Sequence, residues 1–193
     1  LLSRRQRQMC IRDRTFKDES FLVFTVAMYG FISAYPDAVI DNKYYTISRE
    51  SISPLSDAYT EAEFEKLFAF AKKTLTAKAL LATEQRIPGV GNGVTQDILF
   101  NAGIHPKQKV FDLSDGQKGV LFKSLKDTLM AMTSGRGRDT QTDLYGNEGG
   151  YKTILSSKTW KNPCPRCGSV IVKEAYLGGS VYYCSECQKI RKT

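Results

Sequence analysis

Four cysteines near the end of the chain constrain its fold more than any other feature. They form two Cys-x-x-Cys pairs separated by sixteen residues: Cys164, Cys167, Cys184 and Cys187. Each pair can present two thiolates from one tight turn, and two pairs complete a tetrahedral all-sulfur site of the structural kind. We therefore predict that these four residues bind one structural zinc ion. The alternatives are two disulfides or a redox pair, and a cytosolic location disfavours disulfides.

The residues between the two cysteine pairs predict a β-hairpin. Ile171–Tyr176 and Val181–Tyr183 are rich in β-branched and aromatic residues, and Gly178-Gly179 lies between them. Gly168 suits the first cysteine turn, because glycine adopts a positive φ without steric cost. Such a module has little core of its own, and metal binding adds about 10–16 kcal/mol to the stability of comparable modules.

Helical patterns fill the middle of the chain. Thr60–Glu63 and Ser114–Gln117 are capping-box candidates, which satisfy the free amides at the start of a helix. We predict a helix after each box, and further helices over Leu75–Thr83 and Val94–Asn101, the last closed by Gly103. The helix after Ser114 carries apolar residues on one face: Leu121, Leu125, Leu129 and Met132. Glycine-rich Gly135–Tyr151 is typical of a functional loop.

The first fifty residues predict strands. Phe21–Ala34 contains no charged residue and indicates one or two buried strands broken near Gly30, and Tyr44–Ser48 indicates another. So few strands do not form a stable sheet alone, so we interpret residues 15–50 as a remnant of an N-terminal β domain. Residues 1–14, including Cys10, resemble a translated sequencing adapter in part, and we interpret them as a non-native leader. A basic arm that binds DNA backbone is the alternative.

The net charge of +8 is concentrated at the two ends of the chain. Residues 1–14 carry +4 and residues 158–193 carry +5, whereas residues 15–157 carry −1. A basic metal-binding module fits a polyanion partner such as DNA, although an ordinary solvated surface has a similar composition. The sequence contains neither an apolar run of about 20 residues nor a signal peptide. We therefore expect a cytoplasmic protein.

A glycine-rich turn precedes the helix predicted over Val94–Asn101. Its sequence is Gly89-Val90-Gly91-Asn92-Gly93. Free amides and the positive end of a helix dipole meet at such a turn and can bind a phosphate. We expect Asn92 either to cap the helix or to donate its amide to that phosphate. A plain tight turn with a capping asparagine is the alternative.

This turn, with Asp97, Ala102–Pro106 and the four cysteines, resembles the formamidopyrimidine-DNA glycosylase/endonuclease VIII family. The resemblance implies an α+β protein, with a helix–two-turn–helix domain over residues 51–150, a zinc finger over 151–193 and a β-sandwich remnant before them. It implies base-excision repair by a DNA glycosylase with AP lyase activity. The expected partner is double-stranded DNA containing damaged bases or abasic sites, bound by a monomer associated with the bacterial nucleoid. The alternative is a non-catalytic module that binds damaged or bent DNA.

The resemblance also assigns DNA contacts. Gly91 and Asn92 correspond to phosphate contacts, Lys78 lies where the family often has a lysine, and Arg138 lies in the loop that can close over an everted base. Tyr29 is the candidate wedge in the duplex, although a strand-core position is an equal alternative. His105 is expected to be a capping or surface residue.

Three positions depart from the family pattern. The family's nucleophile is an N-terminal proline, whereas this sequence begins Leu1-Leu2-Ser3, so we assign no catalytic residue and expect this chain to lack lyase activity. An arginine usually lies five residues before the third cysteine, where this chain has Gly179, and Lys173 or Lys189 would have to compensate. Met28 replaces the arginine expected beside the wedge. These departures indicate altered lesion choice or weakened catalysis.

Overall fold

The computed structural model describes residues 9–27, 35, 39–69 and 71–191, and it divides the chain into two compact units, residues 1–41 and 42–193. In the first unit, β1 (Met9–Thr15) pairs antiparallel with β2 (Phe21–Ala27). The sequence analysis did not predict β1. The interpretation of residues 1–14 as a leader stays a prediction.

Two described side chains at the start of β2 lie in solvent. Phe21 is 66% exposed and Val23 is 56% exposed, so the prediction of a buried strand is wrong for these residues. The physical reason is that the described sheet has two strands, and neither face is covered by another described element of this unit. Met28, Tyr29 and Gly30 lie outside the described residues.

The second unit begins with α1 (Lys43–Glu50), where the sequence analysis predicted a strand over Tyr44–Ser48. That prediction is wrong because Asn42 caps a helix at this point. Its side-chain oxygen accepts hydrogen bonds from the amides of Tyr44 at 2.9 Å and Tyr45 at 3.1 Å. A side-chain cap of this kind satisfies amides that a helix start leaves free.

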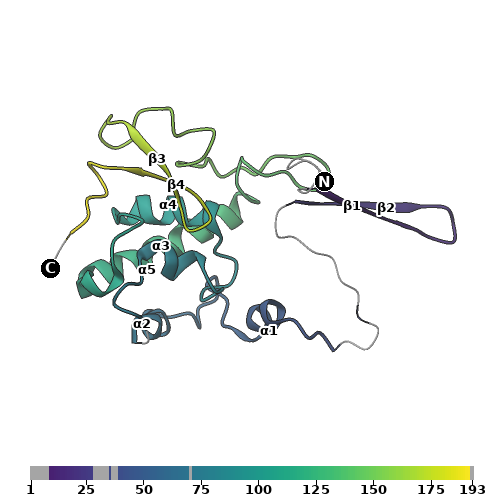
Figure 1. Cartoon of the computed structure of the whole chain (residues 1–193), viewed down its shortest axis with the longest axis horizontal. Coiled ribbons are helices and arrows are strands. Elements are labelled where there is room, and N and C mark those ends of the chain that lie inside the picture. Colours follow the sequence, from purple (N-terminus) through teal and green to yellow (C-terminus); the bar gives the residue numbers. More distant parts are fainter. Residues whose placement is uncertain (1–8, 28–34, 36–38, 70, 192–193) are drawn as a thin grey trace, which may run out of the picture. The chain divides into compact units, whose positions relative to one another are not determined.

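Within the described residues, four further helices and one 3-10 helix follow, and they form one packed group (Figure 1). Thr60 and Thr76 each accept a hydrogen bond from the third residue after them, and Ser114 forms the predicted capping box with Gln117. Gly103 ends one helix in the left-handed conformation, as predicted. The elements are α2 (Glu61–Ala69), α3 (Ala77–Ala82), α4 (Asn92–Ala102), η2 (Val110–Asp112) and α5 (Asp115–Ser134).

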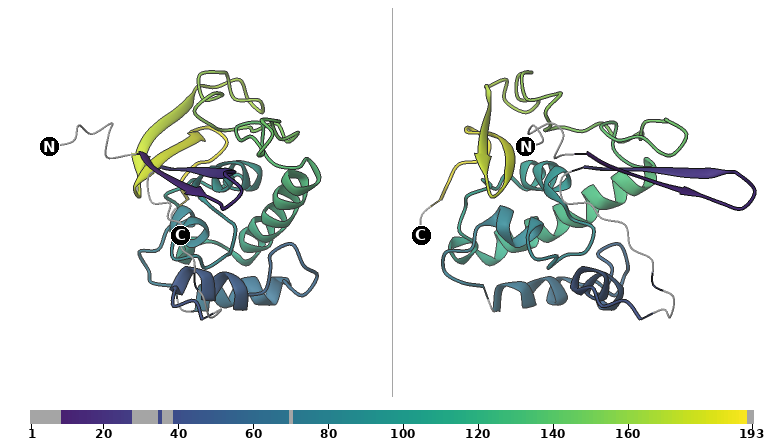
Figure 2. Two further views of the ribbon diagram at one scale, coloured as in Figure 1. Left: turned by 90° about the vertical axis from the view of Figure 1, so that its right-hand side faces the viewer. Right: turned by 45° about the vertical axis from the view of Figure 1, so that its right-hand side comes forward.

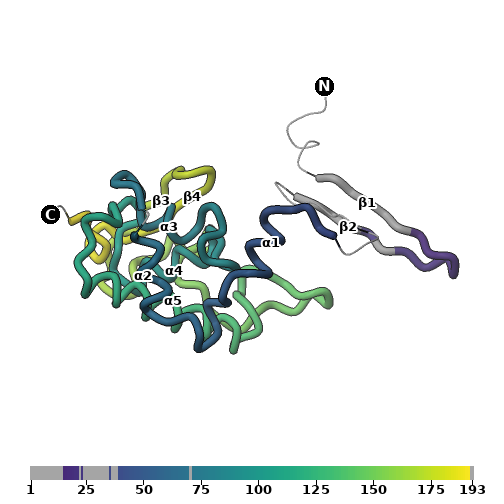
Figure 3. The backbone as a smooth tube through the Cα atoms, turned by 90° about the horizontal axis from the view of Figure 1, so that it is seen from below, coloured from purple at the N-terminus to yellow at the C-terminus, as the bar shows by residue number. Residues whose placement is uncertain are grey.

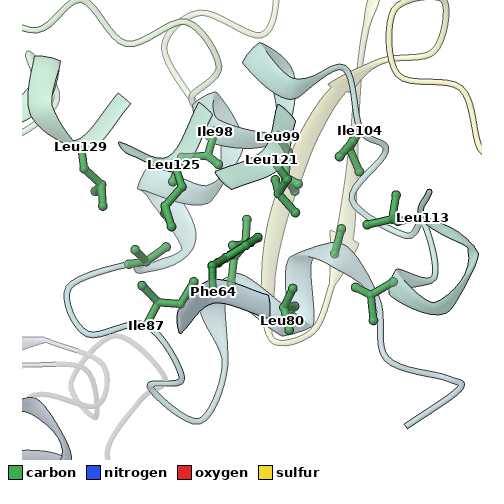
Figure 4. Close-up of a cluster of buried hydrophobic side chains, with 14 of the residues drawn as sticks. Phe64, Leu80, Ile87, Ile98, Leu99, Ile104, Leu113, Leu121, Leu125 and Leu129 are labelled. Carbon is green, nitrogen blue, oxygen red and sulfur yellow. The ribbon is translucent and has the colours of Figure 1, made fainter. Parts of the chain in front are cut away.

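Apolar side chains from all four helices meet in one core. Phe64 of α2 is fully buried and lies near the centre of this cluster, with Leu80 of α3 and Leu121 of α5 around it (Figure 4). The apolar face predicted for the long helix is confirmed, since its four members are all buried: Leu121, Leu125, Leu129 and Met132. The same group of helices is seen from below in Figure 3.

A two-stranded sheet follows the helices and packs against α4. β3 (Ile171–Tyr176) and β4 (Gly179–Cys184) form an antiparallel hairpin, which confirms the prediction between the cysteine pairs. Figure 2 shows this hairpin beside α4. Phe100 of α4 enters a second core, formed with residues of the hairpin and the segment before it: Leu155, Cys164, Ile171, Tyr182 and Cys184.

The segment between α5 and the hairpin is held by one buried carboxylate. Asp97 of α4 is fully buried and accepts hydrogen bonds from the amides of Ile154 at 3.0 Å and Leu155 at 2.8 Å. The Tyr151 hydroxyl is a further partner. Burial raises the pKa of Asp97, while the amides, Tyr151 and Arg138 act in the opposite direction. Among the described residues, no helix is both long and apolar enough to cross a membrane.

We predict that Asp97→Asn lowers the free energy of unfolding by about 1–3 kcal/mol, because an amide offers one acceptor oxygen where two amide donors converge. Urea denaturation measures the loss. Asp127→Asn, which changes an exposed residue of α5 paired with Lys123, is the matched control and should change stability by less than about 0.5 kcal/mol. Equal effects of the two substitutions would contradict the role given to Asp97.

Candidate metal centre and nucleic-acid interface

The four cysteine sulfurs lie close enough together to share one metal ion. Their Sγ atoms are all within 4.8 Å of one another, with 3.4 Å between Cys167 and Cys184 and 3.8 Å between Cys164 and Cys187. Four sulfurs placed tetrahedrally about 2.3 Å from a zinc ion are separated by about 3.8 Å. A disulfide bond is about 2.05 Å long. The arrangement therefore fits a four-thiolate metal site, and all four cysteines are free.

Local hydrogen bonds shape the two cysteine turns. Gly168 has a φ of +74°, and its amide bonds to the carbonyl of Cys164 at 2.8 Å, so the predicted role of this glycine is confirmed. In the second turn, fully buried Gln188 accepts from the Cys184 amide at 3.0 Å and donates to the Ile104 carbonyl at 2.8 Å. This side chain ties the cysteine turn to the loop after α4.

The start of α4 presents backbone amides without a side-chain cap. Gly91 is the N-cap residue, so the prediction that Asn92 caps the helix is wrong. The first turn contains no acidic residue, and Gly89, with a φ of +82°, turns the chain just before it. Uncapped amides at the positive end of a helix dipole form a suitable environment for an anion.

Asn92 instead faces the hairpin. Its Nδ2 atom donates to the Ser180 carbonyl at 3.2 Å, and Gln96 Nε2 donates to the same oxygen at 2.9 Å. Gln96 also accepts from the Tyr182 amide at 3.2 Å. The sequence analysis missed Gln96, although a buried glutamine one helical turn after Asn92 in an apolar helix was the available signal.

Gly179 allows this contact to be close. A Cβ atom at this position would lie 3.2 Å from Asn92 Nδ2, which is tighter than ordinary van der Waals contact. The hairpin turn itself consists of Leu177 and Gly178, both with positive φ, and Gly179 pairs with Tyr176 inside the ladder. The position where the family usually has an arginine is therefore packed against α4.

Arg138 lies against Gly93 in the first turn of α4. A Cβ atom at Gly93 would overlap Arg138 Nη1, so the guanidinium occupies the space that this glycine leaves open. The two predicted DNA contacts Asn92 and Arg138 thus lie at the same helix end, together with the backbone of Gly91.

A cavity of about 670 Å³ opens beside this helix end. Its lining combines apolar side chains from two helices with arginines and the glycine turn: Gly89, Val94, Leu129, Met132, Arg136 and Arg138. A mainly apolar lining with a few polar groups is typical of a small-ligand pocket.

Lys78 is buried, with 2% of its surface exposed, and burial lowers its pKa. Its Nζ atom donates to the Tyr176 carbonyl in the hairpin. His105 is also buried, so of its two expected roles, a capping or a surface residue, the surface position is wrong. Its ring packs edge-on against Tyr183 with 4.2 Å between centroids, and its Nδ1 atom accepts from the Lys107 amide.

The two lysines considered as substitutes for the missing arginine have other partners. Lys173 Nζ lies 5.2 Å from the centroid of the Trp160 ring, and Lys189 Nζ lies 3.0 Å from a Glu186 oxygen. Neither contact involves the α4 N-terminus. Tyr29, the candidate wedge, lies outside the described residues.

Comparison with known sequences identifies relatives. No family model matches the chain. The formamidopyrimidine-DNA glycosylase of Carboxydothermus hydrogenoformans is 31% identical over 139 residues, which cover 70% of this chain and 52% of the relative. That of Prochlorococcus marinus is 32% identical over 148 residues, covering 74% and 51%. The chain spans about half the length of these curated relatives.

Solved structures agree with these sequence relatives. The MutM (Fpg) protein of Thermus thermophilus has a TM-score of 0.66 at 21% identity, covering 92% of this chain and 64% of that one, which supports the fold alone. Lactococcus lactis Fpg, solved in complex with abasic-site DNA, has a TM-score of 0.64 at 25% identity, covering 76% and 54%. The predicted α+β fold, mainly helical with a C-terminal cysteine hairpin, is confirmed. Over about half of their length, the chain is therefore homologous to the formamidopyrimidine-DNA glycosylases.

Proposed function

We propose that the whole protein is a DNA glycosylase with AP lyase activity in base-excision repair, and that this chain supplies its DNA clamp. The observation that carries the proposal is the direct contact between the α4 N-terminus and the cysteine hairpin, made by Asn92 and Ser180. It joins the two motifs of the sequence into one surface. The name and the DNA-bound structures of the relatives support the same function.

The metal in this clamp is proposed to be one zinc ion per chain, bound by the four cysteines. A closed all-sulfur set leaves no open position for substrate, so the ion stabilises the hairpin rather than taking part in the chemistry. The second core supports this role. It contains two of the thiolate residues, Cys164 and Cys184, next to Phe100 of α4, so metal binding and docking of the hairpin are linked.

The DNA backbone is proposed to bind at the α4 N-terminus. The amides that follow Gly91, one remaining hydrogen of the Asn92 amide and the Arg138 guanidinium form the donor set. Such donors hold phosphates without reading sequence. The chain's positive charge between residues 158 and 193 favours the same polyanion. We propose a monomer on double-stranded DNA with damaged bases or abasic sites.

The cavity beside Arg138 is proposed to receive the base of an everted nucleotide. Enzymes that act on a base take it out of the stack, which costs a few kcal/mol and requires a pocket for the flipped base. The apolar side chains of Val94 and Met132 offer contact surface for a base, and the two arginines in the lining offer hydrogen-bond donors. The loop after α5 contributes one wall of this cavity.

A non-catalytic module that binds damaged or bent DNA is the second candidate. One observation favours it. Gly179 packs on Asn92 where the family usually has an arginine, so the hairpin offers the lesion phosphate no guanidinium from that position. The two candidates share the clamp and differ in the chemistry of the whole protein.

We predict that the purified chain contains one zinc per molecule and that Cys184→Ser lowers this ratio, because the variant retains three thiolates. Elemental analysis after dialysis measures it. Cys10→Ser, which changes the cysteine outside the cluster, should leave the ratio at one. Equal zinc content in all three proteins would contradict the four-thiolate site.

We predict that Arg138→Met weakens binding to duplex DNA regardless of sequence and reduces the slope of log Kobs against log salt by about 0.9, the effect of one lost phosphate contact. Titration at several salt concentrations measures the slope. Lys123→Met removes the same charge from α5, and should leave the slope unchanged. An unchanged slope for Arg138→Met would remove this residue from the phosphate site.

We predict that the 193-residue chain binds abasic-site DNA without forming a covalent adduct under borohydride, because its first residues provide no proline amine. A full-length relative serves as the positive control. The N-terminal residue of the whole protein separates the two candidates, since a proline amine there supports the enzyme and another residue supports the binding module. Adduct formation by the chain itself would show that another amine is the nucleophile.

A further inference from the structure

Tyr176 is held at three points by the helical part of the second unit. It is the last residue of β3 and pairs with Gly179 across the hairpin turn. Its hydroxyl donates to Thr76 Oγ1 at 3.0 Å, and its carbonyl accepts from Lys78 Nζ. Thr76 is the N-cap residue of α3, and Lys78 lies in the first turn of that helix. One hairpin residue is therefore fixed to α3 through both its side chain and its backbone.

The Tyr176 ring provides the third point. Lys107 Nζ lies 5.2 Å from the ring centroid and Lys78 Nζ lies 5.7 Å from it, both within the range of a cation–π interaction. Two ammonium groups near one ring repel each other. Glu174, two residues earlier in β3, offsets this repulsion, because one of its oxygens lies 2.6 Å from Lys107 Nζ.

A buried lysine at this place needs a structural explanation. Desolvating an ammonium group is costly unless polar partners replace water. The partners recorded for Lys78 are the Tyr176 carbonyl and ring, and both belong to the hairpin. With 2% of its surface exposed, Lys78 does not present its charge to a bound polyanion. The contacts of Lys78 therefore stabilise the position of the hairpin.

The position of the hairpin determines the contact with Asn92. Tyr176 pairs with Gly179, and Gly179 and Ser180 are the residues that lie against Asn92. A small rotation of the hairpin away from α3 would therefore separate Ser180 from Asn92 and change the geometry of the phosphate donors.

We propose that Lys78 and Lys107 are positioning residues, which hold the hairpin in register with the α4 N-terminus through Tyr176, and that the buried Lys78 does not itself contact DNA. This inference rests on the proposed function of the clamp. It assigns Lys78 a different role from the DNA contact that the family resemblance implied.

The test is duplex DNA binding by the zinc-loaded full chain at several salt concentrations. Lys78→Met keeps the alkyl stem and removes the donor, and we expect it to weaken binding about ten-fold at every salt concentration with an unchanged salt slope. Its effect should be less than additive with that of Asn92→Ala, because both act on the same contact. A slope reduced by about 0.9, or full additivity, would overturn the proposal in favour of a direct phosphate contact.

A second variant keeps the proposal testable where Lys78→Met fails to fold or loses zinc. Lys107→Met combined with Glu174→Gln leaves the net charge unchanged, and the same weakening with the same slope is expected. Lys123→Met is the control for loss of a lysine. Wild-type affinity for the Lys107–Glu174 double variant would overturn the role of this pair.

Hydrogen exchange separates this proposal from the proposed function. Without DNA, Lys78→Met should speed exchange of the backbone amides of residues 177–182, whereas Lys123→Met should not. A wild-type chain that does not bind DNA would refute the clamp and leave this readout intact. Unchanged exchange in Lys78→Met would refute the positioning role, even where the wild-type chain binds DNA.

Discussion

The second unit depends on polar side chains that α4 buries against its neighbours. Asp97 accepts the amides at the start of the segment that leads to the cysteines, and Gln96 pairs with the backbone of β4. Buried polar groups of this kind are costly when unpaired. Their pairing therefore specifies one arrangement of loop, hairpin and helix, whereas apolar packing around Phe100 alone would tolerate several.

The same helix places its N-terminus at the centre of the proposed interface. Asn92 and Gly93 belong to its first turn, so the hairpin contact and the Arg138 contact are fixed by the register of a single element. Gly93 and Gly179 matter here because they have no side chain, so a neighbouring group can lie close to the backbone. Gly93 admits a guanidinium, and Gly179 admits the Asn92 amide. The two contacts are consequently made at neighbouring residues of one helix.

Much of this arrangement could be predicted from local sequence. The cysteine spacing, the Ser114 capping box and the left-handed Gly103 each express a rule that involves a few neighbouring residues, and the structure confirms them. The prediction of a strand over Tyr44–Ser48 was wrong because it rested on the β-branched and aromatic residues of this segment. The helix cap at Asn42 determines the structure there instead. Predictions for Asn92 as a cap and His105 as a surface residue failed for another reason. Their partners, Ser180 and Tyr183, are distant in sequence, and only the packed hairpin brings them together.

Gly179 packs closely against Asn92 at the position where the family usually has an arginine. A long cation at that position would have to leave the ladder near Asn92, where even a Cβ atom is crowded. In this hairpin, direct packing against α4 thus takes the place of a charged contact with DNA. Backbone amides and one neutral amide interact with a phosphate through oriented dipoles, whose contribution depends on geometry more than on ionic strength. A clamp built in this way relies on the accurate position of its hairpin, which is the property that the buried lysine beneath Tyr176 controls.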